Sequence, residues 1–178
     1  MVLKDGPGVD TTLIDDFSDP TRARNGQSWR FFSDRVMGGV SLGTAEHETV
    51  DGRPALRLTG DVSLENNGGF IQVALDLTAE GRTLDASAFT GVELTLRGDG
   101  ADYAVNLRTS DLRYPWQSYR AAVASAASWT THRVPFAAFL AQRTDHPLNP
   151  ARLRRIGLIA IGEARRVDVA ITELRFFH

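Results

Sequence analysis

Short segments of alternating apolar and polar residues, separated by turn-forming residues, run through most of this chain. The clearest are residues 92–97 (Val-Glu-Leu-Thr-Leu-Arg) and 103–108 (Tyr-Ala-Val-Asn-Leu-Arg). In a β-strand such alternation places the apolar side chains on one face and the polar ones on the other. Residues 98–100 (Gly-Asp-Gly) between them suit a turn, because Gly and Asp tolerate positive φ. The two segments therefore predict an antiparallel hairpin.

Similar patterns predict further strands over residues 13–17, 55–60, 69–75, 115–123, 129–134, 153–161 and 167–176. Helical periodicity is scarce and is limited to one or two turns over 136–142 and 150–154. Many short strands with little helix indicate an all-β sandwich or barrel. At 178 residues the chain is expected to form a single domain, with its core over about 13–177. The expected core aromatics are Trp29, Phe31, Phe70, Phe89, Trp129, Phe136, Phe139 and Phe176.

Composition removes several functional classes. Cysteine is absent, so disulfides, thiolate nucleophiles and cysteine-based metal sites are not available. Twenty basic residues, of which Lys4 is the single lysine, face 22 acidic ones, and this balance argues against a nucleic-acid binder. No apolar run is long enough for a transmembrane helix, so no membrane insertion is expected. The acidity of the N-terminal region opposes a secretory or transit peptide, which favours a cytoplasmic location; its aspartates are Asp5, Asp10, Asp15, Asp16 and Asp19.

No catalytic constellation is visible in the sequence. The histidines, His47, His132, His146 and His178, are far apart and show none of the spacings of metal-binding motifs. The chain also lacks a G-x-S-x-G nucleophile motif. We therefore expect a protein that is not an enzyme, although carboxylates distant in sequence could still meet in the fold.

Two groups of residues are candidate sites. Asp16 or Asp19, near the first strand, could hold a structural calcium ion with Glu173 on the last strand, because carboxylate oxygens suit that ion. The alternative is a solvated acidic loop, and no other cofactor is expected. The second group is the polar face of the predicted hairpin and the next strand, where arginine, amide and aromatic side chains could bind a glycan or a protein. Its residues are Arg97, Asn106 and Arg108, with Trp116, Gln117 and Tyr119 on alternating sides of the next strand, and the alternative is a solvated outer face.

Residues 33–41 (Ser-Asp-Arg-Val-Met-Gly-Gly-Val-Ser) resemble the signature of the CIA30 family, the complex I intermediate-associated protein 30. Further features of the family follow in order, and the resemblance spans roughly residues 15–176. They are Gly60, residues 63–70 (Ser-Leu-Glu-Asn-Asn-Gly-Gly-Phe), residues 97–100 (Arg-Gly-Asp-Gly) with Tyr103, Trp129, Pro135-Phe136 with Phe139, and residues 156–158 (Ile-Gly-Leu).

The resemblance implies a galactose-binding-like jelly-roll sandwich. It also implies a non-catalytic assembly factor whose partners are subunits or intermediates of respiratory complex I (NADH:ubiquinone oxidoreductase). The alternative is a carbohydrate-binding module of the same fold, with a glycan on the polar sheet face. Within the signature, Asp34 is expected to accept backbone N–H bonds and Arg35 to pair with Asp34, Glu65 or Asp99. These loops are expected to be mainly structural, or to form a binding edge.

Overall fold

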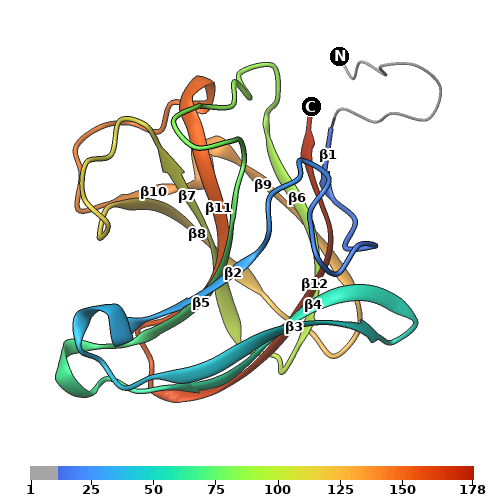
Figure 1. Cartoon of the computed structure of the whole chain (residues 1–178), viewed down its shortest axis with the longest axis vertical. Coiled ribbons are helices and arrows are strands. Elements are labelled where there is room, and N and C mark those ends of the chain that lie inside the picture. Colours follow the sequence, from blue (N-terminus) through green and yellow to red (C-terminus); the bar gives the residue numbers. More distant parts are fainter. Residues whose placement is uncertain (1–11) are drawn as a thin grey trace.

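The structure, a computed structural model, describes residues 12–178 and folds them into two antiparallel β-sheets that pack face to face (Figure 1). Sheet A contains, in spatial order, β3 (Leu42–Val50), β4 (Arg53–Val62), β12 (Arg165–Phe177), β6 (Gly91–Gly98) and β9 (Thr130–Pro135), and β1 (Leu13–Asp15) pairs with β12. Sheet B contains β10 (Leu140–Gln142), β8 (Ser118–Ala124), β7 (Asp102–Thr109), β11 (Leu153–Ile161), β5 (Phe70–Asp76) and β2 (Arg30–Ser33). The jelly-roll sandwich predicted from the sequence is confirmed.

Alternation along the strands builds the core between the two sheets. The apolar residues of β6 in sheet A and of β7 in sheet B point into the space between the sheets and are buried there. Their polar neighbours along each strand face outward. Of the expected core aromatics, Phe136, Phe139 and Phe176 are buried. The other five, Trp29, Phe31, Phe70, Phe89 and Trp129, are half-buried.

The predicted hairpin of residues 92–108 is wrong. Both strands exist, but β6 pairs with β12 and β9 in sheet A, whereas β7 pairs with β8 and β11 in sheet B. The 98–100 segment turns the chain, as its Gly and Asp residues suggested, but carries it from one sheet to the other. A period-2 pattern places apolar residues toward the core in either sheet, so it cannot distinguish a hairpin from such a crossing.

Helical structure is limited to four short 3-10 helices, η1 (Asp34–Met37), η2 (Glu65–Asn67), η3 (Phe136–Ala138) and η4 (Pro150–Arg152). The last two fall at the predicted helical turns, although the helical expectation for residues 140–142 was wrong because they form β10. Strands β2, β3 and β10 were not predicted. Among residues 12–178 no helix is long and apolar enough to cross a membrane, and Asp5 and Asp10 lie outside these described residues.

Candidate binding surfaces

The predicted polar face is divided between the two outer faces of the sandwich. Because β6 and β7 belong to different sheets, Arg97 lies on sheet A, away from Asn106 and Arg108 on sheet B. Arg97 Nε donates to the carbonyl oxygen of Ala127 at 2.8 Å and lies 3.8 Å from a carboxylate oxygen of Asp51. Arg97 is therefore part of an outer face with its own ion pairs, separate from the other predicted binding residues.

The residues predicted on the next strand have three different roles. Tyr119 is buried, and its hydroxyl donates to the carbonyl oxygen of His146 at 2.9 Å, so its prediction as a binding residue was wrong. Gln117 Oε1 accepts the backbone N–H of Arg113 at 2.9 Å and so closes the loop before β8. Trp116 is exposed and stacks on Tyr114 with ring centroids 4.8 Å apart, which leaves a flat aromatic pair at the surface.

A groove with a volume of about 1030 Å³ lies on the outer face of sheet B, and we call it the arginine groove. Strands β2, β5, β11 and β7 supply its floor, and the segments 78–82 and 110–115 form its rim. Its charged lining consists of Arg30, Arg82, Arg108, Arg154 and Arg155 with Asp76 and Glu80. Five arginines against two carboxylates make the groove strongly cationic, although the whole chain has a net charge of −2.

One carboxylate on the floor serves two guanidinium groups. Asp76 accepts a hydrogen bond from Arg30 Nη2 at 3.0 Å and another from Arg155 Nε at 2.8 Å. Both guanidinium carbons also lie over the ring of Phe32, at 5.3 Å and 5.4 Å from its centroid. These contacts hold the two cations at fixed positions across the floor.

Arg108 has no carboxylate partner among residues 12–178. Its Nη1 donates to the carbonyl oxygens of Tyr114, Pro115 and Gln117, and so connects β7 to the rim. Burial lowers the pKa of Arg108, and the nearby cations of Arg155 and Arg154 lower it further. The groove therefore concentrates positive charge that the described protein does not neutralise. Only Asn106 and Arg108 of its floor were predicted from the sequence. Arg30 lies on β2, which was not predicted, and its pair with Asp76 joins distant segments.

The signature segment of residues 33–41 folds around the buried carboxylate of Asp34. Its Oδ2 accepts hydrogen bonds from Ser41 Oγ at 2.5 Å, from the Gly69 N–H at 2.5 Å and from the Phe70 N–H at 3.2 Å, while Oδ1 accepts the Ser41 N–H at 3.0 Å. Burial raises the pKa of Asp34, but the hydrogen bonds from Ser41, Gly69 and Phe70 outweigh it and hold the pKa below its ordinary value. The expectation that Asp34 accepts backbone N–H bonds is confirmed.

Two glycines of the family motifs let the loops close on this carboxylate. A Cβ added to Gly39 would lie 2.5 Å from Asp34 Oδ1, and one added to Gly68 would lie 2.5 Å from Oδ2. No other residue type fits such an approach without displacing a loop. Arg35, in contrast, makes no ion pair with any residue of the described chain, so its predicted pairing with Asp34, Glu65 or Asp99 was wrong. Its side chain is exposed because η1 turns it outward.

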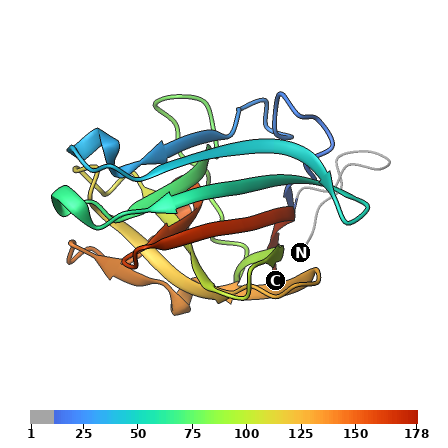
Figure 2. The same ribbon diagram turned by 90° about the horizontal axis from the view of Figure 1, so that it is seen from below.

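Several exposed apolar residues lie on the segments that meet at these two loops, and we call this area the signature surface; one of them, Val36, also lines the arginine groove. Figures 1 and 2 show η1 (blue) and η2 (green) side by side at one end of the sandwich. The end of β11 lies there too, because Ile161 pairs with Phe70 and the Gly162 N–H donates to the Gly69 carbonyl oxygen at 2.9 Å. The exposed apolar residues of the signature surface are Val36, Met37, Val40, Leu42, Leu64 and Ile161.

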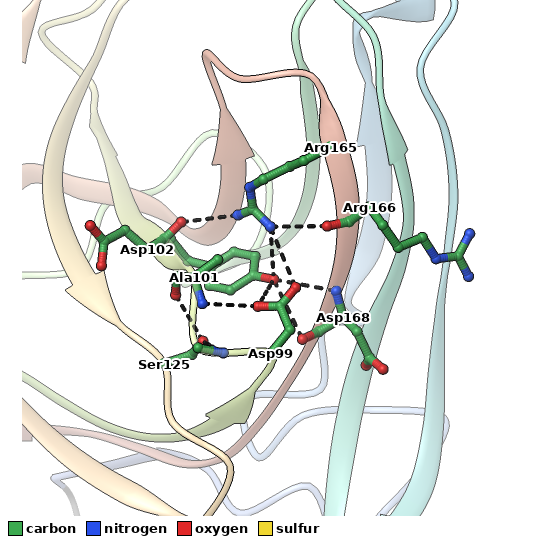
Figure 3. A network of polar contacts seen from close by, with 9 residues as sticks. Asp99, Ala101, Asp102, Ser125, Arg165, Arg166 and Asp168 are labelled. Carbon is green, nitrogen blue, oxygen red and sulfur yellow. Dashed lines mark hydrogen bonds and ion pairs between the residues drawn. The ribbon is translucent and has the colours of Figure 1, made fainter.

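A polar network fixes the crossing between the sheets at the β6–β7 turn (Figure 3). The Tyr103 hydroxyl donates to Asp99 Oδ1 at 2.8 Å, and the guanidinium of Arg165 lies 4.6 Å from the Tyr103 ring centroid. Arg165 also donates to the Asp102 carbonyl oxygen at 3.0 Å, and the Asp99 N–H donates to the Asp168 carbonyl oxygen at 3.1 Å. The 97–100 motif with Tyr103 thus joins β7 to β12, which is a structural role.

The predicted calcium ligands do not come together. Among residues 12–178 no three His, Asp or Glu side chains are grouped to hold a metal ion. Asp16 and Asp19 each close their own turn, by accepting hydrogen bonds from Ser18 and Thr21, and Glu173 lies 3.7 Å from Arg53 Nη2. The first and last strands do pair, but the carboxylates are engaged locally, so this calcium prediction was wrong.

Comparisons with known proteins agree with this architecture. The family model described as Complex I intermediate-associated protein 30 (CIA30) matches residues 16–170. No curated protein sequence matches the chain. A family 11 carbohydrate-binding module of a cellulosomal cellulase of Clostridium thermocellum is similar in structure, with a TM-score of 0.69 and 11% identity over 93% of this chain and 92% of that one.

Two other solved structures show the same fold. The family 11 module of Clostridium thermocellum in complex with a β-1,3-1,4-mixed-linked tetrasaccharide has a TM-score of 0.69 and 12% identity, over 93% of this chain and 94% of that one. A family 30 carbohydrate-binding module has a TM-score of 0.64 and 15% identity, over 94% of this chain and 87% of that one. At these identities the likeness shows a common fold.

Proposed function

The chain belongs to the CIA30 family, and from that premise we propose that it is a non-catalytic binding domain that acts on a protein partner in the assembly of respiratory complex I. The observation that carries this proposal is the signature surface. Six of the nine exposed large apolar side chains among residues 12–178 belong to it, and Val36 and Met37 are 77% and 60% exposed. Apolar side chains gathered on the surface of a folded domain are typical of protein-binding sites.

Arg35 gives the signature surface a charge that a partner can use. Its exposed guanidinium precedes Val36 and Met37 and has no ion-pair partner in the described chain. Arginine surrounded by apolar contacts is a common anchor of protein interfaces, because its planar fork pairs with a carboxylate in two places. The partner surface we propose is therefore apolar with an acidic residue opposite Arg35.

The hydrogen bonds of Asp34 hold this surface ready for binding. They join η1, the start of β3 and the start of β5, so the loops that present Val36, Met37 and Leu64 are ordered before a partner arrives. A preorganised surface loses less conformational entropy on association than a flexible one. This is our explanation for a buried carboxylate at the centre of the signature.

Deletion of the gene followed by native gel electrophoresis tests the proposal. We expect less assembled complex I in the deletion strain and recovery on expression of the wild-type chain. A Val36→Glu/Met37→Glu variant should fail to restore assembly, whereas Leu140→Glu, at a 69% exposed position on β10, should restore it. Unchanged complex I in the deletion strain would count against the proposal. The cytoplasmic location stays a prediction.

A second candidate function is carbohydrate binding in the arginine groove. The groove lies on the outer face of a sheet, and its lining includes Pro115, whose sequence neighbours Tyr114 and Trp116 stack on one another. Exposed rings of this kind pack on sugars. The similar module from Clostridium thermocellum was solved with a tetrasaccharide, which makes a glycan a reasonable ligand to test. A glycan array with the purified chain is the direct experiment, and an array without a binder would remove this candidate.

A further inference from the structure

We infer that the arginine groove binds a linear oligosaccharide that carries carboxylate groups. This inference rests on the second candidate function, the use of the groove for a glycan, and adds the chemical class of the ligand. The charge of the groove is its starting point. With five arginines and two carboxylates, the lining is cationic in a chain whose net charge is −2, so the positive charge is concentrated here.

Three of these arginines have no carboxylate partner among residues 12–178. Arg108 donates to backbone carbonyl oxygens, and Arg82 on the rim and Arg154 on β11 are exposed without an ion pair. The remaining two, Arg30 and Arg155, share Asp76. A neutral ligand would leave this excess charge uncompensated, whereas a carboxylate would match the donor fork of a guanidinium.

The arginines are spread along a line across the sheet. Asp76, Arg155 and Arg108 are direct cross-strand neighbours on β5, β11 and β7, and Arg30 reaches Asp76 from β2. Neighbouring strands are roughly 4.8 Å apart, so these four strands span roughly 14 Å. A linear ligand that crosses the strands would meet successive cations, which favours a chain with repeated negative groups over a single compact anion.

The groups between the charges favour a saccharide over an acidic peptide. Gln72 lies over Gly157 and accepts a hydrogen bond from Asn106 Nδ2 at 3.3 Å, so planar amides cover the centre of the floor. Asn106 Oδ1 is buried and accepts no hydrogen bond from the described residues. Arg120, its neighbour on β8, has a buried Nε that donates to none of them. A sugar hydroxyl can donate and accept at once, and ring faces can pack on the Tyr114–Trp116 pair.

Isothermal titration calorimetry of the full chain tests the inference. The probes are linear oligogalacturonate and oligomannuronate, each beside its methyl-esterified form, which keeps the sugar chain and removes the charge. We expect at least one free-acid probe to bind, with an affinity that falls as salt is added, and its ester to bind at least about tenfold more weakly.

Variants separate the groove from the rest of the surface. Arg82→Gln/Arg154→Gln changes two exposed side chains without ion pairs, so the fold should be kept, and Arg108→Gln removes a half-buried cation. Each should weaken binding of the acid probe about tenfold or more. Arg166→Gln removes the same charge from the outer face of sheet A and should leave the affinity within about twofold.

The remaining outcomes overturn the inference in distinguishable ways. Equal binding of an acid probe and its ester would refute the requirement for carboxylates while leaving glycan binding in place. Binding of a neutral mixed-linked glucan, without binding of any acid probe, would also refute the requirement for carboxylates and leave glycan binding in place. Tighter binding of a poly-glutamate peptide would assign the groove to an acidic peptide and contradict the saccharide. No binding of any saccharide would remove both this inference and the second candidate function.

Discussion

Asp34 Oδ2 accepts the backbone N–H of Gly69 at 2.5 Å, and the two residues are 35 positions apart in the sequence. This contact joins the two most distinctive motifs of the chain, residues 33–41 and 63–70. It explains why an acidic residue, paired glycines and a serine occur together in them. The carboxylate supplies the acceptor, the glycines provide the space around it, and Ser41 completes its hydrogen bonds.

Replacing Asp34 with Asn should strongly destabilise the domain. The amide has one acceptor oxygen, and its NH₂ group would face N–H donors that now bind a carboxylate. We expect the free energy of unfolding, measured by urea denaturation, to fall by about 2–3 kcal/mol. Asp85→Asn is the matched control, because Asp85 accepts similar hydrogen bonds from Ser87 in an exposed turn. This variant should show a smaller decrease in the free energy of unfolding. Equal losses in the two variants would contradict a special role for Asp34.

A single methyl group at Gly39 should disturb the same centre. The added Cβ would lie 2.5 Å from Asp34 Oδ1, so the loop must move and weaken its hydrogen bonds. We expect Gly39→Ala to lower the free energy of unfolding by about 2 kcal/mol or more. Gly81→Ala places a methyl group in open space at a positive φ and measures backbone strain alone, on the order of 1 kcal/mol. A smaller loss for Gly39→Ala than for Gly81→Ala would show that the contact is not tight.

Stability should depend on pH through Asp34. Its pKa is lower in the folded state than the ordinary value of about 3.9, so the ionised carboxylate stabilises the fold above that value. This stabilisation is lost as the pH falls through the folded pKa. Urea denaturation of wild type and Asp34→Asn from pH 7 downward should therefore show a difference that shrinks below about pH 4. A difference that stays constant down to pH 2 would contradict this assignment.

The Tyr103 hydroxyl should contribute measurably to stability. It donates to Asp99 Oδ1 at 2.8 Å and lies 3.3 Å from Arg165 Nη1, within the turn that crosses between the sheets. Removing it in Tyr103→Phe should lower the thermal midpoint, with a loss of about 1 kcal/mol in the free energy of unfolding. The Tyr114→Phe control removes an exposed hydroxyl and keeps the ring stacked on Trp116, so its midpoint should match wild type.

The sequence was sufficient to predict most strands, because alternation reports which face of a strand is buried. Strand β3 was not predicted because it lies at the edge of its sheet and has no fully buried residue. Its alternation of apolar and polar residues is therefore weak. The β6–β7 connection was assigned to a hairpin because turn chemistry describes only local geometry. Whether a chain returns beside itself or crosses to the other sheet is decided by distant partners, here β12 and β11.

The candidate sites were harder to predict from the sequence, because they too depend on contacts between distant segments. Asp34 was identified because it lies within the signature segment and could accept backbone N–H bonds there, whereas the Arg30–Asp76 and Arg155–Asp76 pairs join segments far apart in the chain. Tyr119 and Arg108 were both predicted as binding residues, but alternation along β8 points Tyr119 into the core. Exposure of Val36 and Met37 was not foreseen, because apolar residues in a motif are usually expected to be buried.

Affinity purification from native cells, followed by mass spectrometry, tests the central claim most directly. The wild-type chain should co-purify with subunits of respiratory complex I. The Val36→Glu/Met37→Glu variant should lose them, and the Leu140→Glu variant, which changes another exposed apolar residue, should retain them. Co-purification of the same respiratory subunits with all three proteins, or their absence from the wild-type sample, would contradict the assignment of the signature surface as the binding site.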